Sequence, residues 1–379
     1  MRKQIKTILI LLLVLVPFFN SSAQEVVETN TTIKGRVVEI LDQETRNVPG
    51  TNTPHTYQTI TAEILSGEKE GQIITIENDF LEMKPGSVFY ANHFSDIDGR
   101  DYYSIINIER KNGLIILTLI FVLSVVLLSG WQGARSIIAL IGSFLAIFYI
   151  LIPGMLAGWS PVLASSLVAG SVLFFAIFFT HGFNRESFVA YIGTILSVVL
   201  TILLAKFAIN ITSLSGIATE ESVYLNFNTQ GSINFVELLL GGIIIGILGV
   251  LDDISITQVA VVRELYDSNK NMTKKEAYKR SIRVGKEHVS ALVNTLILAY
   301  TGTSLPLLLL FSSSGSDMGF SMVNLEIFAT EVVRTMVGSI GIIMTVPIVT
   351  LLAVVYLKNK KHSKSFHVHS HAHAHDHSY

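Results

Sequence analysis

Two adjacent carboxylates interrupt an otherwise apolar stretch of this sequence. Asp252 and Asp253 follow the apolar residues 234–251, and the apolar pattern resumes after them and continues to Val262 without a Gly or Pro. One helix over the whole stretch would be about 43 Å long and would place both carboxylates well inside a bilayer. Ionisable groups at such depth are costly and mark ion or proton pathways. If the helix instead stops before the pair, the two groups are its hydrated end.

Hydroxyl groups follow these carboxylates at helical spacing. Ser255 lies three residues after Asp252, and Thr257 lies four residues after Asp253. On a helix these spacings bring the side chains to the same faces. The four residues are therefore a candidate site for a cation or an exchangeable proton, with a helix-end or packing role as the alternative.

A second polar lane lies about forty residues further along the chain. Ser290, Asn294 and Thr301 recur at spacings of four and seven, with Thr295 beside them, and Pro306 predicts a break in the helix that carries them. Broken helices line the central sites of transporters because freed backbone groups need polar partners. We expect Asn294 to face the aspartates, with Thr295 and Thr301 in the same site. Hydrogen bonding between neighbouring helices is the alternative.

The C-terminal tail alternates histidine with other residues. This pattern favours loose, multidentate binding of Zn, Ni or Cu. The predicted ligands are His367, His369, His371, His373, His375 and His377. The alternative is a tail that binds metal only in the test tube.

Three other features have structural interpretations. Gly242 and Gly246 have the GxxxG spacing of a helix-packing face. Glu331 and Arg334 have the spacing of an ion pair on one helix. Residues 273–285 begin with a capping-box pattern and continue as a basic helix, which suits either an anionic lipid surface or a solvated loop.

Composition places these residues in a membrane protein. Half of the 379 residues are hydrophobic and 15% are charged, whereas soluble domains are nearer a quarter charged. The net charge of −2 gives no indication of nucleic-acid binding. The sequence has no cysteine, which excludes disulfides, zinc–thiolate sites and a thiol nucleophile.

Seven apolar segments have lengths near those needed to cross a bilayer. They are residues 114–129, 137–152, 161–179, 188–209, 234–251 (extending further if the helix continues), 289–311 and 331–357. Fourteen lysines and arginines lie in alternate loops and the tail, including the 263–287 loop, and the intervening loops have none. The positive-inside rule therefore predicts a cytoplasmic tail.

The N-terminal part is predicted to lie on the other side of the membrane. Residues 1–23 have the charged start, short apolar run and small residues of a signal peptide, with an uncleaved anchor as the alternative. Residues 24–112 show short alternating segments separated by turn formers. This pattern predicts a small β-barrel-like domain with an OB-like arrangement of strands. The expected strands are 31–41, 58–65, 72–77, 87–92 and 102–109. Residues 113–357 then form the transmembrane domain and 358–379 the tail.

Two segments resemble a known family. Residues 246–257, which contain the aspartates, and residues 294–302 are similar to the signature stretches of the YibE/F-like family of bacterial membrane proteins. Residues 67–71, Gly-Glu-Lys-Glu-Gly before a predicted strand, are similar to that family's exported region. The resemblance covers most of residues 31–357. It implies a bacterial inner-membrane protein described as a permease, without a substrate.

The expected function is secondary transport of a small solute or ion, with a divalent metal suggested by the tail. A scaffold or sensor whose exported β domain binds an envelope partner is the alternative. An enzyme is not expected, since two neighbouring aspartates on one helix point about 100° apart and no Ser–His pair or His-Glu-x-x-His motif is present. No phosphate-binding Gly-Lys-Ser/Thr motif is present either, which excludes ATP hydrolysis by this chain.

Overall fold

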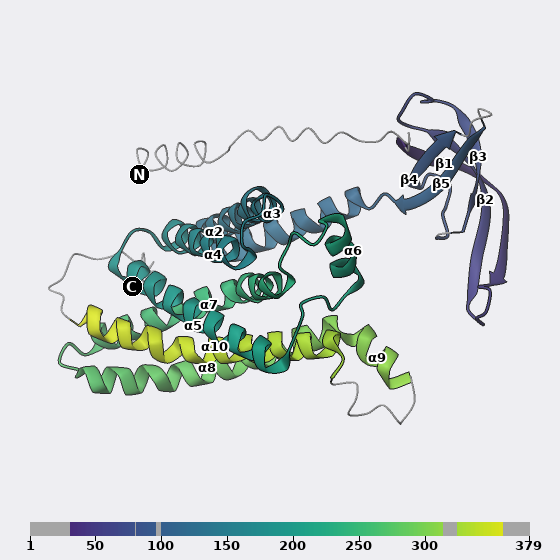
Figure 1. The fold of residues 1–379 in the computed structure, drawn as a ribbon. Coiled ribbons are helices and arrows are strands. Elements are labelled where there is room, and N and C mark those ends of the chain that lie inside the picture. Colours follow the sequence, from purple (N-terminus) through teal and green to yellow (C-terminus); the bar gives the residue numbers. More distant parts are fainter. Residues whose placement is uncertain (1–30, 80, 96–99, 314–323, 359–379) are drawn as a thin grey trace, which may run out of the picture. The chain divides into compact units, whose positions relative to one another are not determined.

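The computed structural model describes residues 31–79, 81–95, 100–313 and 324–358 (Figure 1). The chain divides into two compact units, with the division at Phe121. The predicted signal peptide and the histidine-rich tail lie outside the described residues.

The first unit contains a five-stranded antiparallel sheet, as the alternating pattern predicted. Its strands are β1 (Thr31–Asn47), β2 (Pro54–Ile64), β3 (Ile73–Asn78), β4 (Val88–Ser95) and β5 (Asp101–Ile108). Their spatial order is β3-β2-β1-β4-β5. The central strand pairs on both sides at one position, since Gly35 lies opposite Ile64 of β2 and Phe89 of β4.

One face of this sheet forms an apolar core. It contains Val37, Ile60, Ile76 and Phe89, each at most 3% exposed. A Cβ on Gly35 would lie 2.5 Å from the Phe89 ring, so this ring requires glycine beneath it. The edge strands β3 and β5 contact each other without forming a hydrogen-bonded ladder. The sheet is therefore a half-barrel, and an OB-like closed barrel stays a prediction.

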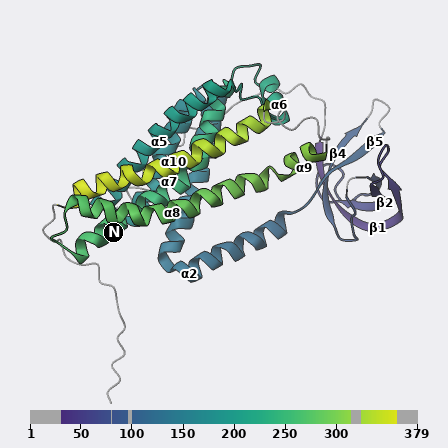
Figure 2. The same ribbon diagram turned by 90° about the horizontal axis from the view of Figure 1, so that it is seen from below.

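The second unit is helical. Its elements are α2 (Lys111–Ala146), which begins before the division, the π-helical η1 (Ile147–Leu151), α3 (Ile152–Leu156), α4 (Pro161–His181), α5 (Arg185–Thr212), α6 (Glu220–Asn228), α7 (Phe235–Ser268), α8 (Lys274–Thr303), α9 (Leu305–Ser313) and α10 (Glu326–Leu357). Figure 2 shows α5, α7, α8 and α10 side by side.

Five helical segments of the described chain are long and apolar enough to cross a membrane: Lys111–Leu156, Pro161–His181, Arg185–Thr212, Phe235–Ser268 and Glu326–Leu357. The first two predicted spans fall in one of these, Lys111–Leu156, which has a break at Gly130 (φ 57°, ψ −137°). The predicted sixth span is divided between α8 and α9, so neither helix alone is long and apolar enough. The count of seven spans therefore stays a prediction.

Small residues bring the central helices together. A Cβ on Gly193 of α5 would lie 2.8 Å from Val349 of α10, and one on Gly341 of α10 would lie 2.5 Å from the Thr201 hydroxyl. Close approach of this kind is typical of helix packing in membranes. α7 packs against both helices through the fully buried Ile247.

The segment between the predicted fifth and sixth spans is not a long loop. α7 continues to Ser268, where Arg263 forms a 2.7 Å ion pair with Glu186 of α5. α8 begins at Lys274, and the Thr273 hydroxyl accepts a hydrogen bond from the Glu276 amide, as the capping pattern predicted. The predicted basic helix is present, but it does not end near Gly285, because it continues without a break into the apolar part of α8.

Candidate functional site

The two aspartates lie in the middle of α7, not at its end. Asn234 caps the helix by accepting a hydrogen bond from the Glu237 amide, and the helix then runs for 34 residues. No proline interrupts it, so apolar packing continues on both sides of the pair. The aspartates are therefore not the end of the helix.

Asp252 has an unusual environment. Its Oδ1 is buried and has no hydrogen-bond partner among the residues that the structure describes. Ser255, predicted to share its face, is buried, but its hydroxyl donates to the Leu251 carbonyl one turn earlier at 2.7 Å. A buried carboxylate oxygen without a donor costs stability, and such groups are typical of functional sites.

Asp253 belongs to an exposed stripe that runs along α7. We define the α7 stripe as Gly242, Gly246, Gly249, Asp253, Thr257 and Ala260, all exposed and spaced three or four residues apart. Asp253 and Thr257 thus share a face, as their spacing predicted. The stripe has almost no side-chain bulk before Asp253, so a solute could approach the helix backbone there.

The stripe is not the packing face that the GxxxG spacing suggested. Nothing lies within 4 Å of a Cβ built on Gly242 or Gly249, and the nearest neighbour of Gly246 is the Tyr300 hydroxyl at 3.3 Å. The packing glycine is instead Gly241, whose Cβ would lie 2.4 Å from the Ser165 hydroxyl of α4.

Two histidines lie near Asp253 from neighbouring helices. His181 is the last residue of α4 and His288 lies in α8, and both imidazoles interact electrostatically with the Asp253 carboxylate. The three side chains are exposed. These histidines were not predicted to lie near Asp253, because nothing in the sequence shows that α4 and α8 meet α7 at this level.

The α8 residues predicted to join the aspartates lie elsewhere. Asn294 lines a groove between α8 and α10, and neither aspartate lines that groove. The Thr295 and Thr301 side chains are exposed and donate to carbonyls of their own helix at 3.0 and 2.8 Å. The structure therefore does not assemble the predicted shared site.

A buried amide that no sequence pattern indicated links three helices. The two N–H bonds of the Gln258 side chain are shared among the Ser281 carbonyl, the Ser281 hydroxyl and the Thr350 hydroxyl, at 2.9, 3.1 and 2.9 Å. All three residues are at most 2% exposed. The network joins α7, α8 and α10 one turn beyond the aspartates.

A pocket of about 500 Å³ with several polar side chains in its lining lies where α8 ends and α10 begins. Its lining includes Tyr300, Ser304, Glu331 and Arg334. The expected ion pair is present, with Arg334 donating to Glu331 at 2.8 Å. α8 ends at Thr303 before Pro306, as the proline predicted.

Within the described parts of the chain, no group of three or more His, Asp or Glu side chains is arranged to hold a metal ion. The predicted metal ligands at His367, His369, His371, His373, His375 and His377 lie outside those parts. Metal binding by the tail stays a prediction.

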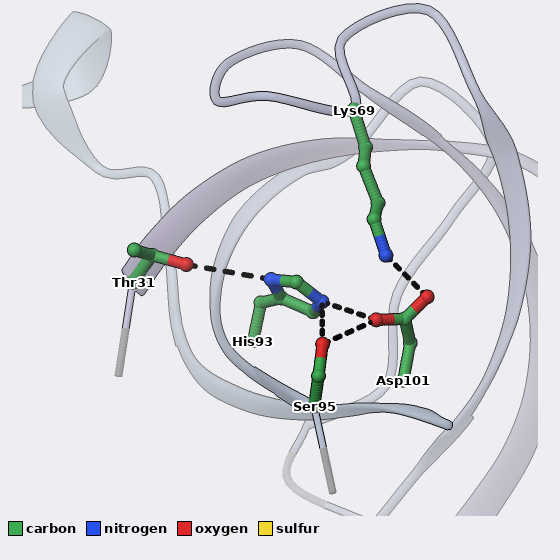
Figure 3. Close-up of polar contacts among 5 residues, drawn as sticks. All are labelled: Thr31, Lys69, His93, Ser95 and Asp101. Atoms are coloured by element: carbon green, nitrogen blue, oxygen red, sulfur yellow. Dashed lines mark hydrogen bonds and ion pairs between the residues drawn. The ribbon is translucent and has the colours of Figure 1, made fainter. Parts of the chain in front are cut away.

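The β unit contains a separate polar cluster (Figure 3). Asp101 accepts hydrogen bonds from Lys69, from Ser95 at 2.7 Å and from His93 Nε2 at 2.8 Å. Ser95 and Asp101 both contact the same imidazole nitrogen, whereas a catalytic triad uses the two nitrogens separately. The cluster ties the β2–β3 turn to β5 and is structural, although it brings a serine and a histidine together without a sequence motif.

This cluster should make the β unit sensitive to acid. The Lys69 ammonium, followed by His93 and Ser95, holds the pKa of the Asp101 carboxyl well below its usual value. The stabilisation is therefore complete above pH 4 or so and is lost as the pH falls toward the folded-state pKa. In the full chain, Asp101→Asn should speed hydrogen exchange of β4 and β5 at pH 7. The difference from wild type should shrink between about pH 4 and pH 2. An equal difference at all pH values would contradict this assignment.

The sequence model of one family, described as YibE/F-like protein, matches residues 117–359. Comparison with curated proteins and with solved structures found no match.

Proposed function

This chain belongs to the YibE/F-like family, and we propose that it is a multi-pass membrane transporter whose small cationic substrate passes the Asp253 carboxylate. The observation that carries the proposal is the pair of carboxylates in the middle of a continuous apolar helix. One of them has a buried oxygen without a partner in the described structure, and the other ends a lane of exposed glycines. Packing alone gives no reason for either charge.

The arrangement of α4 and α7 supports a position for Asp253 within the membrane. Ser160, just before α4, donates a hydrogen bond to Glu237, so these helices begin at one level. Asp253 lies sixteen residues further along α7, about 24 Å at 1.5 Å per residue. In a hydrocarbon core about 30 Å thick, Asp253 then lies nearer the inner face than the centre. His181, at the inner end of α4, is close to it for the same reason.

The helices also support the predicted topology of seven membrane crossings. Seven crossings result if the two arms of α2 on either side of Gly130 count separately and α8 with α9 counts as one broken span. The exported β unit then lies outside a bacterial plasma membrane and the tail inside. Gly130 and the break at Ser304 are the positions on which this count depends.

A divalent metal is the first substrate to test. The Asp253 carboxylate would attract a cation, and the histidines of the tail, which lie on the same side of the membrane in the predicted topology, are ligands that Zn, Ni and Cu accept. Since a transport site must also release its ion, a loose set of ligands fits better than a closed cage.

The test is uptake of Zn²⁺, Ni²⁺ and Mn²⁺ into vesicles containing the purified full-length protein, followed with an internal metal-sensitive dye. We expect uptake of one metal at least tenfold above that of empty vesicles. Asp253→Asn should abolish it. Glu237→Gln, a carboxylate replacement at the other end of α7, is the matched control and should leave uptake intact.

A tail-truncated protein separates the tail from the site. Loss of uptake on truncation with normal uptake in Asp253→Asn would move the metal site to the tail. If no metal enters and a pH-sensitive dye also shows no proton movement, the transporter proposal is refuted.

A second function is favoured by the surface of the β unit. Phe94 and Tyr102 stack at 5.2 Å and are 44% and 43% exposed, and Ile106, also on β5, is 40% exposed. Exposed aromatic groups are frequent at protein interfaces. A scaffold that binds an envelope protein here would lose its partner in Phe94→Ser without any change in flux.

A further inference from the structure

α8 carries an exposed lane on the side away from α7. Ser290, Asn294, Ile297 and Thr301 are all exposed and follow spacings of four, three and four. The face of α8 that meets α7 is different, since it contains Ser281, whose hydroxyl contacts Gln258, and Tyr300, which contacts Gly246. The alternating spacing is that of the seam between two helices that wind around each other.

Asn294 is the one polar side chain of this lane that its own helix does not satisfy. Ser290 and Thr301 donate to the carbonyls of Lys286 and Ile297 at 2.9 and 2.8 Å. The Asn294 amide makes no hydrogen bond within the described ranges, although Val293, Ile297 and Leu298 beside it on α8 are apolar. In hydrocarbon, the N–H groups of an amide need a hydrogen-bond acceptor and its carbonyl needs a donor. A second Asn294 offers both.

The surface beside the lane has room for another helix. Ser290 and Asn294 line a groove of about 750 Å³ against α10. Its α10 wall includes Ile343, Val346 and Pro347. Because Pro347 has no N–H, it cannot donate the usual helical hydrogen bond to the Ile343 carbonyl. The rest of the lining is mostly apolar.

The charges at the inner end of the lane are also self-complementary. Lys286 and Glu287 are adjacent and exposed, and neither forms an ion pair with any described residue. Around a two-fold axis parallel to α8, the two Glu287 side chains continue the seam, and each lies next to Lys286 of the other copy, whose charge offsets the repulsion between them.

We propose that two copies of this chain pair through α8, with the helices parallel and the two Asn294 amides bonded to each other. A single asparagine in such a seam fixes the register and favours two strands. In a membrane, polar side chains of this kind hold helices together. The pairing is independent of the proposed transport activity.

The absence of native cysteine permits a direct test. Ser290→Cys and Ile297→Cys are introduced singly into the full-length protein and oxidised in native membranes. Both should give a covalent dimer, because a disulfide requires Cβ atoms about 3.5–4.5 Å apart. Leu203→Cys on α5, 61% exposed, is the control for random collision and should stay monomeric.

Asn294→Leu in the Ile297→Cys protein should reduce dimer formation at least fivefold, and Asn294→Gln should restore part of it. Equal cross-linking at positions 297 and 203 would overturn the proposal. Native mass spectrometry could also overturn it. The contradicting result is a monomer with a bound anionic lipid that is lost in Lys286→Gln, because a lipid would then occupy the groove. Vesicle uptake by the cross-linked protein reports on transport separately.

Discussion

Asp252→Asn should unfold at a higher temperature than the wild type and transport nothing. The buried Oδ1 of Asp252 has no hydrogen-bond partner in the described structure, so removing the charge relieves a desolvation cost. We expect a gain of about 1–3 kcal/mol, which corresponds to several degrees in melting temperature. A group retained at the expense of stability is typical of a functional site. The measurements are the melting temperature in detergent and the vesicle uptake described above.

Asp253→Asn separates the effect on transport from the effect on stability. Its carboxylate is exposed and interacts with His181 and His288, so its replacement should remove transport with little change in melting temperature. If Asp252→Asn instead lowers the melting temperature, Asp252 has a structural role and the site reduces to Asp253.

Gly285→Val should cause the largest loss of folded protein among single substitutions in α8. A Cβ at this position would lie 2.6 Å from Val346 Cγ1 and 2.7 Å from the Gln258 amide nitrogen. The substitution therefore overpacks the α8–α10 contact and displaces an amide that three buried acceptors share. Together these effects should cost about 3 kcal/mol.

The measurement is the monodisperse yield and the melting temperature of the purified protein. Gly302→Val in the same helix is the matched control, because nothing lies within 4 Å of a Cβ there. Gln258→Leu should reproduce part of the loss without adding bulk at position 285. Equal effects at positions 285 and 302 would mean that the loss comes from glycine replacement in a helix and not from packing.

Local patterns were sufficient for several elements of this fold. Strand alternation predicted the five-stranded sheet, and Pro306 predicted the end of α8, since a proline removes one backbone donor wherever it lies. The lack of a breaker after Asp253 likewise indicated that α7 continues. Each of these depends only on residues near one another in sequence.

Tertiary features were harder to predict. Gly241 and Gly242 lie about 100° apart on one helix, and the sequence does not say which of them meets α4. For the same reason Asn294 was expected to face α7 but lines the groove against α10. Gln258 went unnoticed because its acceptors, Ser281 and Thr350, lie on two other helices.

In the proposed transporter, the uninterrupted length of α7 would restrict which helices can move. A helix of 34 residues without a break behaves as a rod about 51 Å long, so it cannot bend to cover and uncover Asp253. Any change of access must come from the helices beside it. α8 ends in a joint at Ser304, and α10 lacks one backbone hydrogen bond at Pro347. In that case α7 would stay fixed during transport, and α8 and α10 would move relative to it.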